Sequence, residues 1–222
     1  MVRGVSPRPD GSTNDTSSIR VVLTDFDGVV RHWPAAVTAS VEDRHGLQRG
    51  SLARAAFDPS ILNEAITGRM TDSEWRSEVQ RRLQADTDAA TARSAVSAWS
   101  TGRGVVDGGA LQVLQAARSV AALGLVTNAT TRLDDDLARL GLSDAFDFVV
   151  NSSAIGCAKP SRCFYEHAAR RCGCEPGAVL FVDDRRENVE AAIDFGFHGH
   201  LHRDPETLGR LLREWNLACE GG

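Results

Sequence analysis

Short apolar runs and helical patterns alternate through the second half of the chain, and one apolar run also lies near its beginning. Residues 21–23 read Val-Val-Leu, an uninterrupted run typical of a strand buried on both faces of a parallel sheet. Further strands are predicted at 120–126, 146–150, 178–182 and 198–202. Helices are predicted at 107–118, 131–140, 160–172, 187–195 and 205–217. This alternation predicts an α/β fold with a Rossmann-like parallel sheet.

The segment 34–104 has a different pattern and contains no convincing strand. Thr71 and Glu74 form the Thr-x-x-Glu pattern of a capping box. Behind it, apolar residues recur at four-residue steps through 75–83, and a second helical pattern covers 92–99. The segment is therefore predicted to be an all-helical insertion.

The domain organisation follows from the place of this insertion. We expect residues 19–33 and 105–222 to form the α/β core, with 34–104 inserted as a helical cap. A linker at 31–34 and a glycine-rich hinge at 102–104 would join the two parts. Residues 1–18 are rich in Ser, Thr, Pro, Gly and Asp, and are predicted to be a disordered leader.

Composition narrows the partners of the protein. The 222 residues are 42% hydrophobic and 25% charged, which is ordinary for a globular protein, and the net charge is −5. An acidic chain argues against nucleic acid as the main partner, because phosphate backbones need a basic face. No apolar run reaches membrane-spanning length and no secretory signal is recognisable, so we expect a cytoplasmic protein, monomeric or homodimeric.

The cysteines are expected to be reduced thiols, because their number is odd and no signal peptide precedes them. The alternative is a structural zinc site that also uses His167, although the spacings do not match the usual Cys-x2-Cys pairs. The five cysteines are Cys157, Cys163, Cys172, Cys174 and Cys219.

Two carboxylates follow the first predicted strand. Asp25 and Asp27 come just past its end, at the edge where open α/β sheets bind ligands. At i and i+2, two acids can share a divalent cation or divide into nucleophile and proton donor. A polar turn would explain them as well. A calcium loop would not, because Gly28 stands at the fourth position rather than the sixth and Val29 at the fifth.

Three further groups of polar residues lie just past other predicted strands or in adjoining loops. Thr127 supplies a hydroxyl, Lys159 a positive charge, and Asp183 and Asp184 two more carboxylates. Taken singly, each residue also has a simpler explanation. Thr127 suits the cap of a turn, Lys159 a solvated side chain, and the two aspartates the cap of the next helix. Together with the first acids they predict a Mg²⁺ site with a cationic cradle for phosphate.

These residues occur in four short motifs, in one order. Thr-Asp-Phe-Asp-Gly stands at 24–28, Val-Thr-Asn at 126–128, Lys-Pro at 159–160, and Val-Asp-Asp-Arg at 182–185 followed by Asn188. In these motifs the chain resembles the haloacid dehalogenase-like (HAD) hydrolase superfamily, in its phosphatase branch with a helical cap of the first type. The insertion lies between motifs one and two, where that cap belongs.

The resemblance implies roles for the catalytic residues. Asp25 would be the nucleophile that forms an aspartyl phosphate, and also a Mg²⁺ ligand. Asp27 would be the general acid and base, with its backbone carbonyl on the metal. Lys159 would orient Asp25, screen charge and bind phosphate.

The resemblance also implies the residues around them. Thr127 and the backbone of Asn128 would bind the substrate phosphate. Asp184 best matches the direct metal ligand of the fourth motif, and Asp183 would act directly or through water. Asn188 stands where many members carry a second acid, so its support would be neutral.

The function implied is Mg²⁺-dependent hydrolysis of a small phosphorylated metabolite, with the cap closing over the substrate. A 2-haloacid dehalogenase is an alternative, but its family pattern lacks the second acid, Asp27. A phosphomutase would share the first half-reaction. A receiver-type phosphoacceptor has its acidic pair before the acceptor, and a non-catalytic binding protein would more often have lost a motif.

A few other residues attract attention without fitting this site. His198, His200 and His202 alternate and so share one face of a strand, which we expect to be an exposed terminal strand rather than a metal site. Trp33 follows the first motif, and it is the aromatic residue of this region that we expect to face the site. Most other aromatic surface of the insertion is expected to be internal packing.

Overall fold

The computed structural model describes residues 18–217. The predicted leader at 1–18 lies outside the described residues except for its last position, and so does Cys219. Within residues 18–217, no helix combines the length and the apolar character that crossing a membrane requires.

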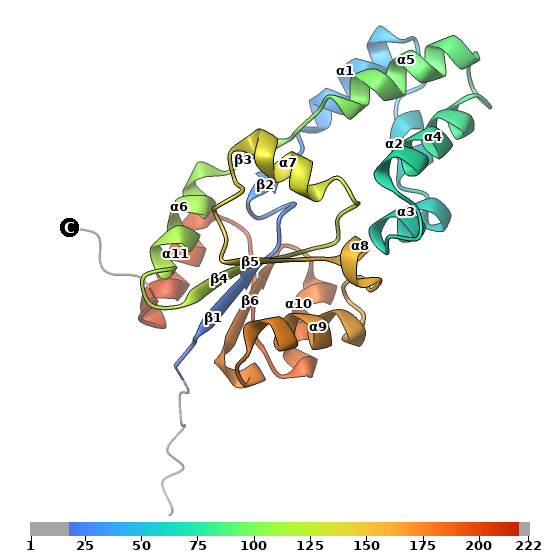
Figure 1. Ribbon diagram of the computed structural model, residues 1–222. Coiled ribbons are helices and arrows are strands. Elements are labelled where there is room, and N and C mark those ends of the chain that lie inside the picture. The colour runs from blue at the N-terminus through green and yellow to red at the C-terminus, as the bar shows by residue number, and fades with distance from the viewer. Residues whose placement is uncertain (1–17, 218–222) are drawn as a thin grey trace, which may run out of the picture.

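A five-stranded sheet forms the centre of the molecule (Figure 1). All four neighbouring strand pairs are parallel, in the order β5-β4-β1-β6-β7. The strands are β1 (Val21–Thr24), β4 (Ala122–Thr127), β5 (Phe148–Asn151), β6 (Val179–Asp183) and β7 (His198–Leu201). The predicted α/β fold with a Rossmann-like parallel sheet is thereby confirmed, and β1, which carries the first motif, lies in the middle.

Helices cover both faces of this sheet, which explains why β1 is buried throughout (Figure 1). Val22 packs with one cluster of side chains, whereas Val21 and Leu23 pack with another on the opposite face. The first cluster includes residues of α6 (Gly108–Ala117), α7 (Leu133–Leu140) and α11 (Pro205–Glu214). The second includes residues of α9 (Arg162–Cys172) and α10 (Arg186–Phe195).

Five helices between β2 and β3 have a hydrophobic core of their own. The predicted capping box is present, since Thr71 and Glu74 bond reciprocally at the start of the fourth helix. The predicted apolar stripe of that helix is buried, and Trp75 meets Trp99 edge to face at 5.5 Å. These helices are α1 (Ala35–Arg44), α2 (Ser51–Ala56), α3 (Pro59–Ile66), α4 (Asp72–Leu83) and α5 (Ala89–Ser100).

The two connections to this helical part run antiparallel to each other. β2 (Arg31–His32) pairs with β3 (Val105–Val106), so the outgoing and returning chains form a small two-stranded stem. Strands of two residues have no periodicity that a sequence can display, and they were not predicted. The short helices α8 (Ser152–Ile155) and η1 (Pro176–Ala178) were missed for the same reason.

The expectation of an exposed strand around the three histidines is wrong, since two of them are half-buried and the third is buried. His202 is only 3% exposed and follows β7, while His200 is half-buried. Burial lowers the pKa of both imidazoles. After α11 the chain returns to this edge, where the Trp215 ring lies 4.6 Å from that of His198.

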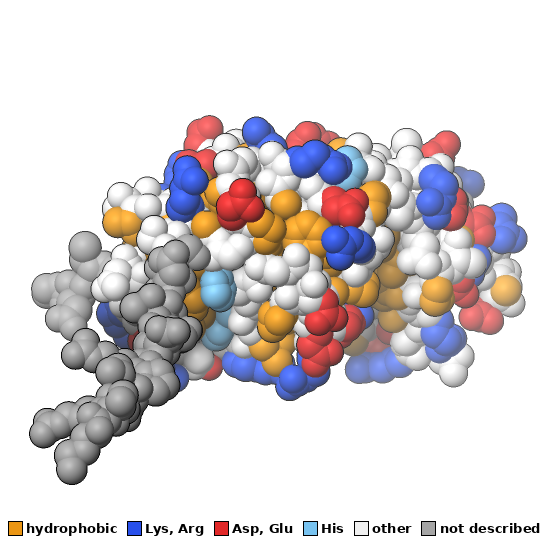
Figure 2. All heavy atoms as spheres, turned by 90° about the horizontal axis from the view of Figure 1, so that it is seen from below, with side chains coloured by type: hydrophobic (Ala, Val, Ile, Leu, Met, Phe, Trp, Pro, Cys, Tyr) orange, Lys and Arg blue, Asp and Glu red, His pale blue; other side chains and the backbone are white. Residues whose placement is uncertain are grey.

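The surface carries both signs of charge. Figure 2 shows arginine and acidic side chains interspersed over the face seen from below. In the described part of the chain, many charged side chains pair locally along helices, as Arg81 and Arg82 do with Glu78. This face therefore presents charges of mixed sign rather than a continuous patch of one sign.

Candidate active site

The carboxyl ends of β1, β4 and β6 bring the predicted residues together. Asp25 follows β1 directly, and Asp183 ends β6, the neighbouring parallel strand. Lys159 reaches them from the loop between α8 and α9. Its Nζ lies 2.8 Å from Asp25 Oδ1 and 2.7 Å from Asp183 Oδ2, and donates to the Val126 carbonyl at 3.1 Å. Three acceptors thus use the three donors of the ammonium group.

Lys159 is the only lysine of the chain, which has 24 arginines. Its side chain is 1% exposed, and those of Asp25 and Asp183 are 8% and 0% exposed. Burial alone would lower the pKa of Lys159, but the two carboxylates outweigh it and hold the pKa above its usual value. A compact ammonium suits this buried position better than a planar guanidinium, because its acceptors lie in three different directions.

Burial dominates the titration of Asp25 and raises its pKa from 3.8 to about 7. Lys159 opposes this rise and Asp183 adds to it. Asp25 Oδ1 also accepts from the Phe26 N–H at 2.7 Å, so two donors fix the orientation of this carboxylate. A divalent cation at the site would further favour its ionised form.

Protein donors contact both carboxylate oxygens of Asp183. Besides Lys159, it accepts from the Arg185 N–H at 2.9 Å and from Asn188 Nδ2 at 3.0 and 3.1 Å. The neutral Asn188, noted in the sequence as a departure from the family pattern, therefore serves as a donor to a buried carboxylate. A second acid at that position would repel Asp183 instead.

Asp184 has one carboxylate oxygen to which no group of residues 18–217 donates a hydrogen bond. This oxygen, Oδ1, is buried, and the other oxygen lies over Gly28, where a Cβ would collide with it. Gly28 also has φ +94°, a conformation that favours glycine. Burial, followed by the charge of Asp183, raises the pKa of Asp184. A buried carboxylate oxygen without a donor is what a metal ligand requires.

The donor set fits Mg²⁺. Asp25, Asp183 and Asp184 each offer an oxygen, and these three atoms lie within 4.8 Å of one another. Three carboxylates around one ammonium leave an excess of negative charge in a buried place, which a divalent cation would balance. Hard oxygen donors are those that Mg²⁺ prefers.

Asp27 lies apart from these three carboxylates. Its two oxygens accept from Arg31 Nε at 2.6 Å and Nη2 at 2.9 Å, and Trp33 Nε1 donates to Oδ1 at 2.8 Å. Trp33 thus points toward the first motif, as the sequence suggested. Arg31 was not singled out from the sequence, where it appeared only as linker. Its one signal there is its place four residues after Asp27.

Arg31 connects Asp27 to the helical part. Its Nη1 donates to Asp136 at 3.1 Å, and Asp136 also accepts from Arg132 Nε at 2.8 Å. Arg132 donates in turn to the carbonyls of Ser100 and Gly102, at the end of α5 and just beyond it. A chain of charged groups therefore runs from Asp27 to the returning connection.

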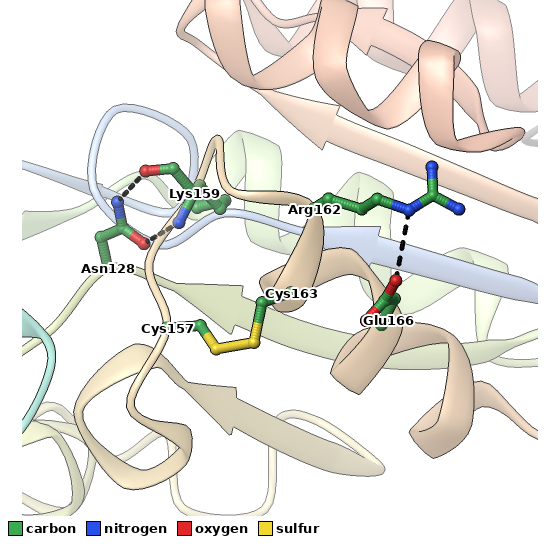
Figure 3. Close-up of a disulfide and its surroundings, with 6 residues drawn as sticks. All are labelled: Asn128, Cys157, Lys159, Arg162, Cys163 and Glu166. Atoms are coloured by element: carbon green, nitrogen blue, oxygen red, sulfur yellow. Dashed lines mark hydrogen bonds and ion pairs between the residues drawn. A yellow bond between two sulfur atoms is a disulfide. The ribbon is translucent and has the colours of Figure 1, made fainter.

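Thr127 and Asn128 end and follow β4. The Thr127 side chain is buried. The Asn128 amide forms two hydrogen bonds with the backbone of Lys159, accepting at 2.8 Å and donating at 2.9 Å (Figure 3). The side chain of Asn128 thus holds the lysine loop in place, a use that the sequence did not indicate. Its backbone role toward phosphate stays a prediction.

A disulfide joins Cys157 to Cys163 beside the same loop (Figure 3). The expectation of reduced thiols is therefore wrong for this pair. The loop around Lys159 turns back on itself, so that residues six apart in sequence have Cα atoms 6.0 Å apart. His167 lies close to both sulfurs, but thiols bonded to each other are not two thiolate ligands for zinc. Cys172 and Cys174 are free.

A Lys159→Met variant is expected to lose about 3–5 kcal/mol of unfolding free energy, because two buried carboxylates lose their counter-charge. Urea unfolding in the absence of divalent metal measures this loss. The matched control is Arg49→Met, which removes an exposed partner of Asp43 and should cost less than about 1 kcal/mol. Equal losses of unfolding free energy in the two variants would contradict the pairing of Lys159 with Asp25 and Asp183.

A comparison with known proteins identifies the family of the chain. The sequence profile described as haloacid dehalogenase-like hydrolase matches residues 19–196. The mouse haloacid dehalogenase-like hydrolase domain-containing protein 3 is 27% identical over 171 residues, covering 77% of this chain and 64% of that protein. The pyrimidine 5'-nucleotidase YjjG of Escherichia coli is 37% identical over 126 residues, covering 50% of this chain and 56% of that protein. The matches thus span less than two thirds of these relatives.

Solved structures share the fold. A HAD family enzyme of Bacteroides thetaiotaomicron, in a magnesium complex, superposes with a TM-score of 0.72 at 19% identity, covering 88% of this chain and 99% of that one. An L-2-haloacid dehalogenase of Xanthobacter autotrophicus superposes with a TM-score of 0.59 at 24% identity, covering 81% and 75%. At such identities the likeness concerns the fold alone.

Proposed function

Because the chain belongs to the haloacid dehalogenase-like hydrolases, we propose that it hydrolyses phosphate monoesters through an aspartyl phosphate, with Mg²⁺ as cofactor. The observation that carries this proposal is the cluster of Asp25, Asp183 and Asp184 beside the lysine, in which one buried carboxylate oxygen accepts no hydrogen bond from the described part of the chain. Such a cluster suits a divalent cation, and phosphoryl transfer is the reaction that needs one beside a nucleophilic carboxylate.

In this proposal Asp25 and Asp184 hold Mg²⁺ together with the backbone carbonyl of Asp27, and Asp183 acts through Lys159 or a water molecule. When bound, the ion neutralises the charge of the phosphoryl group. Lys159 adds a positive charge beside Asp25 and keeps its carboxylate aligned. Thr127 and the Asn128 backbone bind the phosphate.

The reaction has two steps. Asp25 attacks phosphorus, the bond to the ester oxygen breaks, and Asp27 gives its proton to the departing alcohol. Water then attacks the phosphorus of the aspartyl phosphate while Asp27 takes a proton from it. Free phosphate leaves, and Asp25 returns as a carboxylate. The helical cap limits the access of bulk water during the first step.

The names of several relatives agree with this class of reaction. The Escherichia coli relative is a pyrimidine 5'-nucleotidase, and a protein of Methanothermobacter thermautotrophicus that is 36% identical over 81 residues is a glyceraldehyde 3-phosphate phosphatase. The Bacteroides thetaiotaomicron enzyme has also been crystallised with magnesium and inorganic phosphate. The presence of a second acid, Asp27, favours phosphate ester hydrolysis over dehalogenation.

Removal of divalent metal tests the proposal. With a generic aryl phosphate as substrate, a chelator is expected to lower activity by at least about 100-fold, because the excess negative charge of the site then repels the phosphate. Mg²⁺ or Mn²⁺ should restore it, whereas Ca²⁺ should support little turnover, since its looser coordination disturbs the in-line geometry. Full activity in chelator, or metal-independent release of chloride from 2-chloropropionate, would contradict it.

A further inference from the structure

A cavity of about 450 Å³ lies where the helical part meets the core. Asp27 and Asn128 line it from the core, and residues of α1, α3, α4 and α5 line it from the helices. Asp27 is the proposed donor of a proton to the departing alcohol. An ester whose oxygen receives that proton must therefore extend its alcohol portion into this cavity.

The wall of the cavity is largely aromatic and aliphatic. Trp33, Val37 and Phe57 line it with 45%, 40% and 56% of their surfaces exposed, and they are three of the seven large exposed hydrophobic side chains in the described part of the chain. Leu62 and Trp99 line it as well. Apolar side chains that gather around one cavity, rather than scatter over the surface, indicate a binding site for an apolar group.

The charged groups of the cavity are already paired. Arg76 Nε lies 2.6 Å from Asp72, and its Nη1 donates to Ser100 at 2.7 Å. Arg31 and Arg132, the other arginines that line the cavity within residues 18–217, are both engaged with Asp136. A substrate with a second anionic group would have to break one of these pairs.

We propose that the cavity receives an uncharged aromatic leaving group, so that the preferred substrates are monophosphates of alcohols that carry an aromatic ring. The inference rests on the proposed phosphatase function and names its substrate class. An aromatic ring can stack on the exposed faces of Trp33 and Phe57 and displace water from them. A polyhydroxylated alcohol would lose hydrogen bonds to water against the same wall.

Three phosphate esters of primary alcohols test the preference for an uncharged aromatic group. Because all three alcohols are primary, differences in leaving-group reactivity are kept small. They are 2-phenylethyl phosphate, ethyl phosphate, and the 2-phenylethyl ester with a carboxylate on the ring. With Mg²⁺ present, kcat/KM for 2-phenylethyl phosphate is expected to exceed that of each of the others by about 10-fold or more. Equal values for the three esters, or a preference for the carboxylated one, would overturn the inference.

Acetyl phosphate distinguishes a failure of the proposed substrate class from a failure of the phosphatase function, because it is activated and too small to fill the cavity. If it is hydrolysed but the aromatic ester is not preferred, the substrate class is wrong and the phosphatase function stands. If neither acetyl phosphate nor any of the esters is hydrolysed, the phosphatase function itself fails.

Two variants test whether the preference for an aromatic group arises from the wall of this cavity. Phe57→Ala is expected to lower kcat/KM for 2-phenylethyl phosphate by about 10-fold and to change that for ethyl phosphate much less. Val120→Ala removes an equally exposed side chain, 56% in both cases, which does not line the cavity, and should leave the ratio of the two substrates unchanged. An unchanged ratio in Phe57→Ala would contradict the assignment of this cavity.

Discussion

An Asp25→Asn variant is expected to lose activity on the order of 10⁴–10⁶-fold in kcat, the range seen when a unit of a covalent catalytic apparatus is removed. An amide is not a nucleophile toward phosphorus at neutral pH, so neither half-reaction can begin. The fold should survive, because the amide has the same size as the carboxylate and Lys159 still pairs with Asp183. The loss would therefore report on chemistry rather than on stability.

Intact mass after rapid quenching provides the direct measurement. The wild-type protein, mixed with an activated aryl phosphate and Mg²⁺, should show a phosphorylated species, and Asp25→Asn should show none. Asp43→Asn is the matched control, since Asp43 is an exposed acid in α1 whose partner is Arg49. A phosphorylated species in Asp25→Asn would place the nucleophile elsewhere and overturn the mechanism.

The fold was predictable where local and tertiary requirements agree. The apolar run at 21–23 is typical of a strand buried on both faces, and the Thr71–Glu74 box marks the start of α4 without reference to the rest of the chain. Boundaries were less certain. Val120 is apolar and was assigned to a strand, but it is 56% exposed and β4 begins two residues later.

For the candidate site, the sequence indicated which carboxylates lie near one another, but not which protein groups contact each of them. Parallel strands bring their carboxyl ends to one edge, so Asp25, Asp183 and Asp184 had to meet there. Which carboxylate is filled by protein donors depends on Asn188 and on the lysine loop, and no spacing in the sequence reveals that. The contacts of Arg31 and Asp136 span 105 positions and are equally invisible to local patterns.

The same limit applies to the cysteines. An odd number of cysteines in a chain expected to be cytoplasmic predicts reduced thiols throughout. A disulfide, however, depends on where two particular side chains lie. Cys157 and Cys163 lie on either side of Lys159 in sequence, and the turn between them brings their Cα atoms to 6.0 Å. The bond therefore depends on the path of the loop that carries Lys159, which the sequence outlined only as a short motif.

An Asp27→Asn variant is expected to lose about 10²–10⁴-fold in kcat/KM for alkyl phosphates, the usual contribution of a general acid and base. Attack by Asp25 expels an alkoxide, which is a poor leaving group unless it is protonated. Esters with a good leaving group need less protonation, so the loss for an aryl phosphate should be smaller. The dependence of rate on leaving-group pKa should accordingly become steeper in the variant.

The position of Asp27 requires a control for its two partners. Arg31 and Trp33 together donate three hydrogen bonds to it, and an asparagine offers only one acceptor oxygen. Trp33→Phe removes one of these bonds and keeps the acid. It should change activity far less than Asp27→Asn and leave the leaving-group dependence shallow. Equal effects in the two variants would mean that the orientation of Asp27, rather than its proton, matters.

The second half-reaction gives the sharper outcome. In Asp27→Asn the hydrolytic step lacks its base, whereas attack by Asp25 on an activated aryl phosphate does not need the acid. Phosphoenzyme should therefore accumulate in this variant above the wild-type level, and its presence would show that the nucleophile and the metal site are intact. If Asp27→Asn turns over alkyl phosphates at the wild-type rate, proton transfer belongs to another group and the proposed mechanism is wrong.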